Sequence, residues 1–146
     1  MIKIPTRVLL VDDEEDFVEM LQLRLEAAGE KVRPAYSGRM GLETLAKEEI
    51  DVVILDILMP GMDGIQTLKE IKRRFPLVEV ILLTGHGTTA SAVDGMKQGA
   101  YDYLLKPADI SELETKLEGA RKKKEAQEER IRKAEARLLL RRGGNI

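Results

Sequence analysis

Short apolar runs and longer amphipathic stretches alternate along the chain. The apolar runs are centred on residues 8–11, 31–33, 52–55, 80–83 and 103–105. Several are apolar at every position, as are strands that are covered on both faces of a sheet. The segments between them place apolar side chains at helical spacing, for example Phe17, Leu21 and Leu25. This alternation predicts a parallel sheet with helices on both faces, since right-handed crossovers leave few other topologies.

Three features refine the predicted helices. Gly29 is well placed to end the first helix, because glycine readily adopts the left-handed conformation that follows a helix. The stretch 90–98 has only a thin apolar stripe, and we predict a helix there as well. The last helical pattern is long, since it runs from Ser111 to about Arg142 without a proline.

Composition and charge limit the class of protein. The 146 residues suit one ordinary domain, and a 43% hydrophobic content suffices for a single core. Residues 1–110 hold 13 Lys and Arg against 19 Asp and Glu, whereas residues 111–146 hold 11 against 7. The sequence contains no cysteine, secretory signal pattern or apolar run long enough to cross a membrane. We therefore expect a cytoplasmic protein that does not contact a membrane.

Polar side chains follow the apolar runs where the predicted strands end. Asp12 and Asp13 follow the first run, Asp56 the third, Thr84 the fourth and Lys106 the fifth. In a doubly wound sheet these ends share one edge, so the side chains should meet in a crevice. Converging carboxylates repel one another unless a cation lies among them, and Mg²⁺ suits oxygen ligands beside a phosphate. The set fits phosphoryl transfer with one carboxylate as the nucleophile.

Four motifs at these strand ends occur together in a fixed order. They are Val11-Asp12-Asp13-Glu14, the stretch Leu55-Asp56 to Asp63-Gly64, Leu83-Thr84-Gly85, and Tyr103-Leu104-Leu105-Lys106-Pro107. The set resembles the receiver domain of bacterial response regulators, the CheY-like family, over roughly residues 5–120. The resemblance implies a flavodoxin-like α/β fold, a doubly wound (βα)5 parallel sheet of strand order 2-1-3-4-5. An extended C-terminal helix would follow it.

The resemblance implies roles for the acidic residues. Asp56 matches the residue that accepts the phosphoryl group in that family. Asp12, Asp13, Asp56 and the backbone carbonyl of Leu58 match the groups that hold its Mg²⁺ cofactor. The acids at positions 14–16 are expected to form only the first turn of a helix, which its dipole favours.

The remaining matches concern the switch. Lys106 matches the lysine that contacts the phosphoryl group, and Thr84 matches the hydroxyl that moves toward it after transfer. Tyr103 falls at the aromatic switch position, whose ring turns inward when the threonine moves. The Lys106-Pro107 peptide bond is expected to be cis, as it is in the family. His86, the single histidine, has no second His or Cys beside it, and we expect a loop residue.

The tail beyond these motifs carries a seven-residue repeat. We place a receiver domain at 1–120 and a helical extension at 121–146. The repeat positions are Leu113, Leu117, Ala120, Lys124, Gln127, Ile131, Ala134 and Leu138. A parallel pair of such helices would place Lys123 opposite Glu128, and Arg130 opposite Glu135, of the partner. The repeat therefore favours a homodimer through the C-terminal helix.

Two other interpretations of the tail need no dimer. One is a single solvated helix, stabilised by pairs such as Lys124/Glu128 and Glu128/Arg132. The other is nucleic-acid binding through the basic stretch 121–124. That interpretation is disfavoured because glutamates follow at once and no helix-turn-helix fits in the remaining residues. We expect no direct contact with nucleic acid.

These features predict a signalling switch that catalyses only its own phosphorylation and dephosphorylation. The chain is expected to be a stand-alone response regulator that takes a phosphoryl group from a histidine kinase or phosphotransfer protein. Phosphorylation would alter a face near Thr84, residues 90–98 and Tyr103, which an unidentified downstream protein recognises. A second interpretation is the receiver part of a longer regulator that continues beyond Ile146.

Other classes of protein fit the sequence less well. An aspartate-nucleophile phosphohydrolase would carry a second acid two residues after Asp56, where this chain has Leu58. A dinucleotide-binding domain would continue its first strand into a glycine-rich loop, where this chain has acidic residues.

Overall fold

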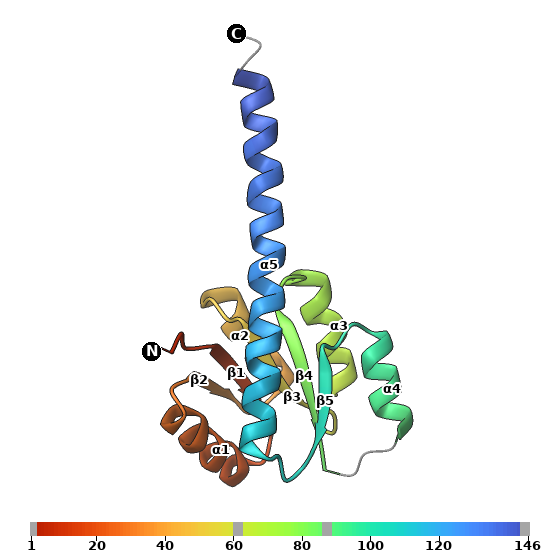
Figure 1. Cartoon of the computed structure of the whole chain (residues 1–146). Coiled ribbons are helices and arrows are strands. Elements are labelled where there is room, and N and C mark those ends of the chain that lie inside the picture. Colours follow the sequence, from red (N-terminus) through yellow and green to blue (C-terminus); the bar gives the residue numbers. More distant parts are fainter. Residues whose placement is uncertain (1–2, 60–62, 86–88, 144–146) are drawn as a thin grey trace.

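The computed structural model describes residues 3–59, 63–85 and 89–143. Over these residues strands and helices alternate (Figure 1). In chain order they are β1 (Arg7–Val11), α1 (Glu15–Ala27), β2 (Lys31–Ala35), α2 (Gly38–Lys47), β3 (Val52–Asp56), α3 (Gly64–Arg74), β4 (Glu79–Thr84), α4 (Thr89–Lys97), β5 (Asp102–Leu105) and α5 (Ile110–Gly143). The strands pair in parallel in the order β2-β1-β3-β4-β5. This topology confirms the predicted doubly wound fold.

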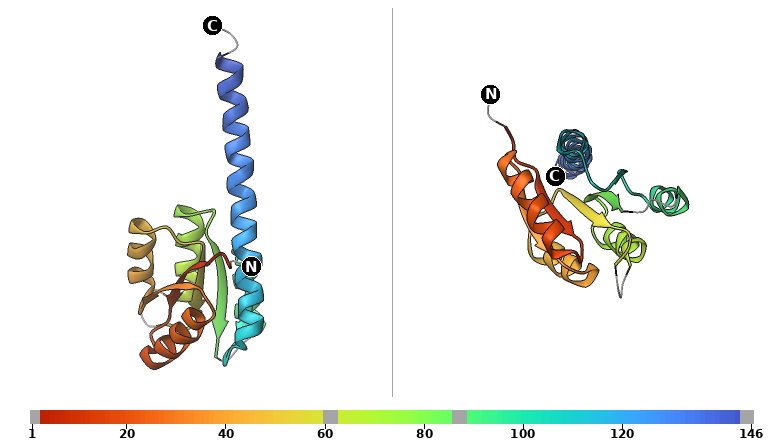
Figure 2. Two further views of the ribbon diagram at one scale, coloured as in Figure 1. Left: turned by 60° about the vertical axis from the view of Figure 1, so that its left-hand side comes forward. Right: turned by 90° about the horizontal axis from the view of Figure 1, so that it is seen from below.

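The sheet is buried on both faces, and successive residues of a strand pack into two separate cores. In β1, Val8 and Leu10 pack with side chains of α1 and α5, whereas Leu9 and Val11 pack with α2 and α3. Figure 2 shows α5 on one side of the sheet and α2 and α3 on the other. All four side chains are fully buried, and burial of each contributes about 1.5–3 kcal/mol. Strands β3 and β4 are buried throughout, which explains their continuous apolar runs.

Local signals set the ends of the helices. Gly29 follows α1 with a φ of +99°, which confirms its predicted role. At the start of α2, the Ser37 hydroxyl accepts a hydrogen bond from the Met40 N–H at 3.1 Å. Helix α3 begins with a capping box in which Asp63 and Gln66 each accept from the other's backbone N–H.

Helix α5 has two halves with different surroundings. Leu113, Leu117 and Ala120 are fully buried against the sheet, and Lys124 is 7% exposed. From residue 129 to residue 143 the helix is exposed and projects beyond the domain (Figure 1). The predicted long helix is therefore confirmed, while the boundary at residue 120 stays a prediction because the helix is continuous there. In the described part of the chain, no helix is both long and apolar enough to cross a membrane.

Two buried carboxylates hold α5 at the amino ends of the strands. Asp51, just before β3, accepts hydrogen bonds from the backbone and guanidinium of Arg7 and lies 3.3 Å from Nζ of Lys124. Glu79, at the start of β4, lies 3.4 Å from Nζ of Lys123. Burial raises the pKa of Asp51, but Arg7 and Lys124 outweigh burial and hold that pKa below its usual value. We call these five residues the amino-end charge cluster.

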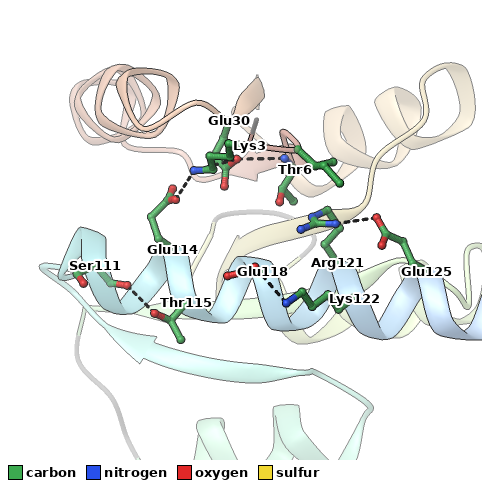
Figure 3. A pocket seen from close by; sticks show the side chains of 11 residues that line it. Lys3, Thr6, Glu30, Ser111, Glu114, Thr115, Glu118, Arg121, Lys122 and Glu125 are labelled. Carbon is green, nitrogen blue, oxygen red and sulfur yellow. Dashed lines mark hydrogen bonds and ion pairs between the residues drawn. The ribbon is translucent and has the colours of Figure 1, made fainter. Parts of the chain in front are cut away.

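A hollow of about 660 Å³, lined mostly by polar side chains, lies between α5 and the amino-terminal segment. Nζ of Lys3 lies 2.7 Å from the carboxylate of Glu114 and 3.5 Å from that of Glu30 (Figure 3). Glu30 also accepts a hydrogen bond from the Thr6 N–H at 3.1 Å. These contacts join α5 to the starts of β1 and β2, so their role is to hold the helix on the domain.

Candidate functional site

The predicted site residues meet at the carboxyl edge of the sheet. Asp12 and Asp13 follow β1, Asp56 ends β3, Thr84 ends β4 and Lys106 follows β5. A crevice forms at this edge because the chain leaves β1 and β3 in opposite directions. One carboxylate oxygen each from Asp12, Asp13 and Asp56 lies within 4.8 Å of the others. These three residues could hold a metal ion.

Lys106 supplies positive charge to this crevice. Its Nζ lies 2.7 Å from Oδ2 of Asp12, 3.3 Å from Oε1 of Glu14 and 3.7 Å from Oδ2 of Asp56. The peptide bond between Lys106 and Pro107 is cis, as the resemblance implied. The lysine from β5 thus reaches back across the sheet to the ends of β1 and β3.

Two residues near the start of α1 also contact Lys106, and sequence reasoning missed both contacts. Glu14 was expected in the first helical turn, but α1 begins one residue later and Glu14 occupies its N-cap position. Its backbone N–H donates to Oδ1 of Asp12 at 2.9 Å, and its carboxylate is free to contact the lysine. The ring centroid of Phe17 lies 4.4 Å from Nζ of Lys106, a favourable cation–π distance. Neither contact has a sequence signal, since each depends on how far the lysine reaches.

The crevice disfavours the ionised form of Asp56. Burial raises the pKa of its carboxyl, and the charge of Asp12 raises it further, to about 6. Burial lowers the pKa of Lys106, but its close contact with Asp12 and the nearby acidic charges outweigh burial, so that pKa is raised. One ammonium cannot neutralise three carboxylates. A divalent cation would remove the excess negative charge.

The backbone after β3 lies close against Asp56. The Leu58 N–H donates to Oδ1 of Asp56 at 3.2 Å, and the Leu58 side chain is 62% exposed. A Cβ added to Gly64 would lie 2.3 Å from the carbonyl oxygen of Asp56. Gly64 is needed for space, because backbone atoms cannot give way. Pro60 and Gly61 of the same motif lie outside the described residues.

The two predicted switch residues differ in exposure. Thr84 is 2% exposed, and its carbonyl accepts a hydrogen bond from the Lys106 N–H at 2.8 Å. Tyr103 is 43% exposed and lines a hollow of about 340 Å³ together with Met96 and other residues of α4. The inward position expected after the threonine moves is therefore not the one seen here. His86 lies outside the described residues.

Comparisons with known proteins agree with this geometry. The family model of the response regulator receiver domain matches residues 8–118. The chain is 42% identical over 113 residues to the transcriptional regulatory protein ZraR of Escherichia coli (strain K12), covering 77% of this chain and 26% of that protein. It is also 42% identical over 113 residues to the DNA-binding transcriptional regulator NtrC of the same strain, covering 77% and 24%. The chain thus spans about a quarter of these relatives.

Solved structures show the same fold. A response regulator receiver domain protein from Clostridium thermocellum is 36% identical with a TM-score of 0.80, covering 84% of this chain and 98% of that one. NtrX from Brucella abortus is 30% identical with a TM-score of 0.81, covering 86% of this chain and 29% of that one.

The sheet order and the acidic crevice define a phosphorylation-dependent signalling module. The chain belongs to the response regulator receiver domain family, whose members are phosphorylated on an aspartate in two-component signalling. Receiver domains of this family take their phosphoryl groups from histidine kinases.

Proposed function

We propose that Asp56 is the phosphoacceptor and that Lys106 and Thr84 position the transferred group. The observation that carries this proposal is the convergence of Lys106 and three carboxylates, with Asp56 central at the end of β3. Its raised pKa reflects burial and the negative charge of Asp12, both of which added positive charge would offset. Leu58 beside Asp56 is 62% exposed, which leaves access for a donor protein.

The transfer is a displacement at phosphorus. One oxygen of Asp56 attacks the phosphoryl group of a phosphohistidine, an oxygen–phosphorus bond forms, and the phosphorus–nitrogen bond breaks. The electron pair leaves with the histidine nitrogen, and the product on this chain is an acyl phosphate. Lys106, now paired with Asp12, would pair instead with a phosphoryl oxygen. The Thr84 hydroxyl would donate to another phosphoryl oxygen.

Magnesium is the cofactor that the donor set fits best. Asp12, Asp13 and Asp56 supply carboxylate oxygens, and the backbone carbonyl of Leu58 would complete the protein ligands. Mg²⁺ prefers oxygen ligands and needs only a few of them from the protein. It keeps several water molecules and also binds an oxygen of the substrate phosphate. When bound, Mg²⁺ would neutralise charge that develops on the phosphoryl oxygens.

Phosphorylation would be read out on the face formed by α4 and β5. Thr84 ends the strand next to β5, so a shift of its hydroxyl toward the phosphoryl group vacates space beside Tyr103. The tyrosine ring, 43% exposed, would turn into that space. The change would alter the hollow between Tyr103 and Met96, where a downstream protein would bind.

The partners follow from this switch. The phosphoryl donor is a histidine kinase or a phosphotransfer protein, and the compartment is the cytoplasm. The chain acts on no substrate other than its own phosphoryl group. A phosphohydrolase role is disfavoured because Leu58 stands where such enzymes carry their second acid. The chain matches 26% of ZraR and 24% of NtrC, so a receiver within a longer regulator is the alternative to a stand-alone one.

A homodimer through the projecting half of α5 is the second part of this proposal. Ile131, Leu138, Leu139 and Leu140 are 44–75% exposed there, which is unusual for a monomer. The pair expected between Lys123 and Glu128 of two chains would have to replace contacts that each residue makes within its own chain. Lys123 lies beside Glu79, and Glu128 lies 3.3 Å from Nζ of Lys124 of the same helix.

Intact mass spectrometry tests the phosphoacceptor directly. The protein is incubated with Mg²⁺ and a small-molecule phosphodonor, in parallel with Asp56→Asn and with Asp16→Asn, which alters an exposed carboxylate of α1. We expect one added phosphoryl group on the unchanged protein and on Asp16→Asn, and none on Asp56→Asn. Phosphorylation of Asp56→Asn, or failure of all three even with a histidine kinase of the same organism, would overturn the assignment.

A further inference from the structure

The projecting half of α5 carries Ile131 and Leu138 on the side that faces its own domain. Lys124, Ile131 and Leu138 follow one another at intervals of seven residues, which is nearly two helical turns. They share one side of the helix, with a drift of about 20° per interval. Because Lys124 is buried against the domain, Ile131 and Leu138 overhang the amino ends of the strands. The projecting helix and the amino-end surface of the domain therefore form a concave angle, which we call the corner.

This corner has an apolar floor and an acidic rim. A hollow of about 360 Å³ lies there, with Ile50, Phe75 and Leu77 in its floor. Its rim includes Glu48 and Glu49, whose side chains are 41% and 85% exposed. Glu48 pairs with Arg33 and Glu49 pairs with Arg7 of the same chain. Each carboxylate can still accept further hydrogen bonds.

The far end of the same helix carries the complementary groups. Leu138, Leu139 and Leu140 are 54%, 68% and 75% exposed. Arg141 and Arg142 follow at once. An apolar end with two cations matches an apolar floor with an acidic rim.

A parallel dimer built on the same side of the helix meets an obstacle. In a parallel pair, the two interacting sides face each other at equal height, and helix axes lie about 8–10 Å apart. Each domain covers that side of its own helix at Leu117 and Lys124. Both domains would then occupy the narrow space between the helices. The parallel register would also place Arg137 opposite Arg142 of the partner subunit.

We infer that two copies of this chain associate in antiparallel fashion, each seating the end of its α5 in the corner of the other. The inference rests on the homodimer proposed above and specifies its arrangement. Pairing about the midpoint between Ala134 and Glu135 sets Ile131 against Leu138 of the partner subunit. The projecting half, residues 129–143, is about 22 Å long, so its end reaches the partner's floor while the domains stay apart. Both contacts repeat by two-fold symmetry.

Disulfide trapping distinguishes the two directions, and the absence of cysteine from the chain makes it clean. Ile131→Cys and Leu138→Cys are made as separate proteins of different mass, with Lys122→Cys on the exposed outer side of α5 as the control. After oxidation we expect a linked heterodimer in the mixture of the first two variants. Each variant alone should link at least about tenfold more slowly, and the control should link with neither.

The outcomes separate the arrangement from the dimer itself. Rapid self-linking of each single variant would mean a parallel pair, which overturns the antiparallel inference and leaves the homodimer standing. Light scattering that shows a monomer at the highest attainable concentration, with and without phosphorylation, would overturn both. Heterodimer linking in the mixture supports both.

A charge exchange tests the corner. Arg141→Glu with Arg142→Glu should weaken the dimer about tenfold, since like charges then meet at the rim. Adding Glu48→Arg and Glu49→Arg to the same chain should restore the affinity of the unchanged protein. Urea unfolding of each variant checks that the domain still folds. Equal dimer affinity in all three proteins would mean that the helix end does not contact the rim.

Discussion

The two ends of the sheet both bury charge, yet they treat it in opposite ways. At the carboxyl end, Asp56 lies close to Asp12, and burial together with that neighbour raises the pKa of Asp56 to about 6. At the amino end, Asp51 is as deeply buried, but Arg7 and Lys124 keep its pKa below the usual value. The carboxyl end has too little positive charge to neutralise its carboxylates, whereas the positive and negative charges at the amino end balance.

This difference teaches what each end is for. Removing one partner of a buried ion pair leaves the other charge buried and unpaired, which is costly. Such a pair therefore fixes the position of the elements that it joins. A buried site with excess negative charge is costly by itself and is stabilised by a ligand of opposite charge. The amino end thus holds α5 in place, while the carboxyl end, in the function proposed above, receives a cation and a phosphoryl group.

The largest effect should come from breaking the amino-end charge cluster. Asp51→Ala removes the buried carboxylate that joins Arg7 to Lys124 and leaves them only the more exposed Glu49 and Glu128, so we expect a loss of about 3 kcal/mol in the free energy of unfolding. Glu49→Ala, which removes an 85% exposed partner of the same arginine, should cost under about 1 kcal/mol. Urea unfolding measures both. A similar small loss in the two variants would show that the cluster does not hold the fold.

A smaller effect of opposite sign is expected at the carboxyl end. The pKa of folded Asp56, about 6, lies above the ordinary 3.8, so its contribution to stability is lost as the pH rises between these values. Without divalent metal at pH 8, Asp56→Asn should therefore be more stable than the unchanged protein by about 1–2 kcal/mol. This gain should vanish near pH 4.

Asp51→Asn is the matched control for that pH dependence. Because the folded pKa of Asp51 is lowered, its contribution is present above the ordinary pKa and is lost as the pH falls through the folded value. The variant should be less stable than the unchanged protein at pH 8, with a deficit that shrinks in acid. Urea unfolding at several pH values measures both variants, and equal slopes of the same sign would contradict the contrast between the two ends.

The smallest effect concerns Phe17, whose ring faces Nζ of Lys106. Phe17→Leu keeps an apolar side chain but removes a cation–π contact of about 0.5–1 kcal/mol. We expect phosphorylation by a small-molecule donor to slow about two- to fivefold, and the ¹³Cε chemical shift of Lys106 to change. Phe17→Tyr should restore both. If Leu and Tyr behave alike, the ring serves packing only.

Sequence reasoning was strongest where several signals coincide. The runs 8–11, 52–55 and 80–83 within β1, β3 and β4 are apolar at each position because both faces of the sheet are covered, so these runs are easy to see. The edge strand β2 was predicted only for residues 31–33, and it extends to Ala35. An edge strand has less apolar sequence, and Pro34 is tolerated there because one side needs no hydrogen bond.

The candidate site was predicted as a set, since strand ends of a parallel sheet share one edge. The sequence did not show how far each side chain extends across the site. The length of the Lys106 side chain brings Glu14 and Phe17 into the site, although both belong to the start of α1. The repeat in α5 was visible, but the burial of its first half against the sheet was not, because a seven-residue repeat fits the chain's own domain as well as a partner helix.

Because α5 is one long continuous helix, a small rotation within the domain produces a larger displacement at the far end of the helix. A tilt of about 5° at Lys124 would displace the far end of the helix by roughly 2 Å, given about 1.5 Å of rise per residue. A spectroscopic label near Arg142 would therefore report a change in the domain that the domain's own atoms scarcely register. Any body joined to that end would be carried through the larger arc.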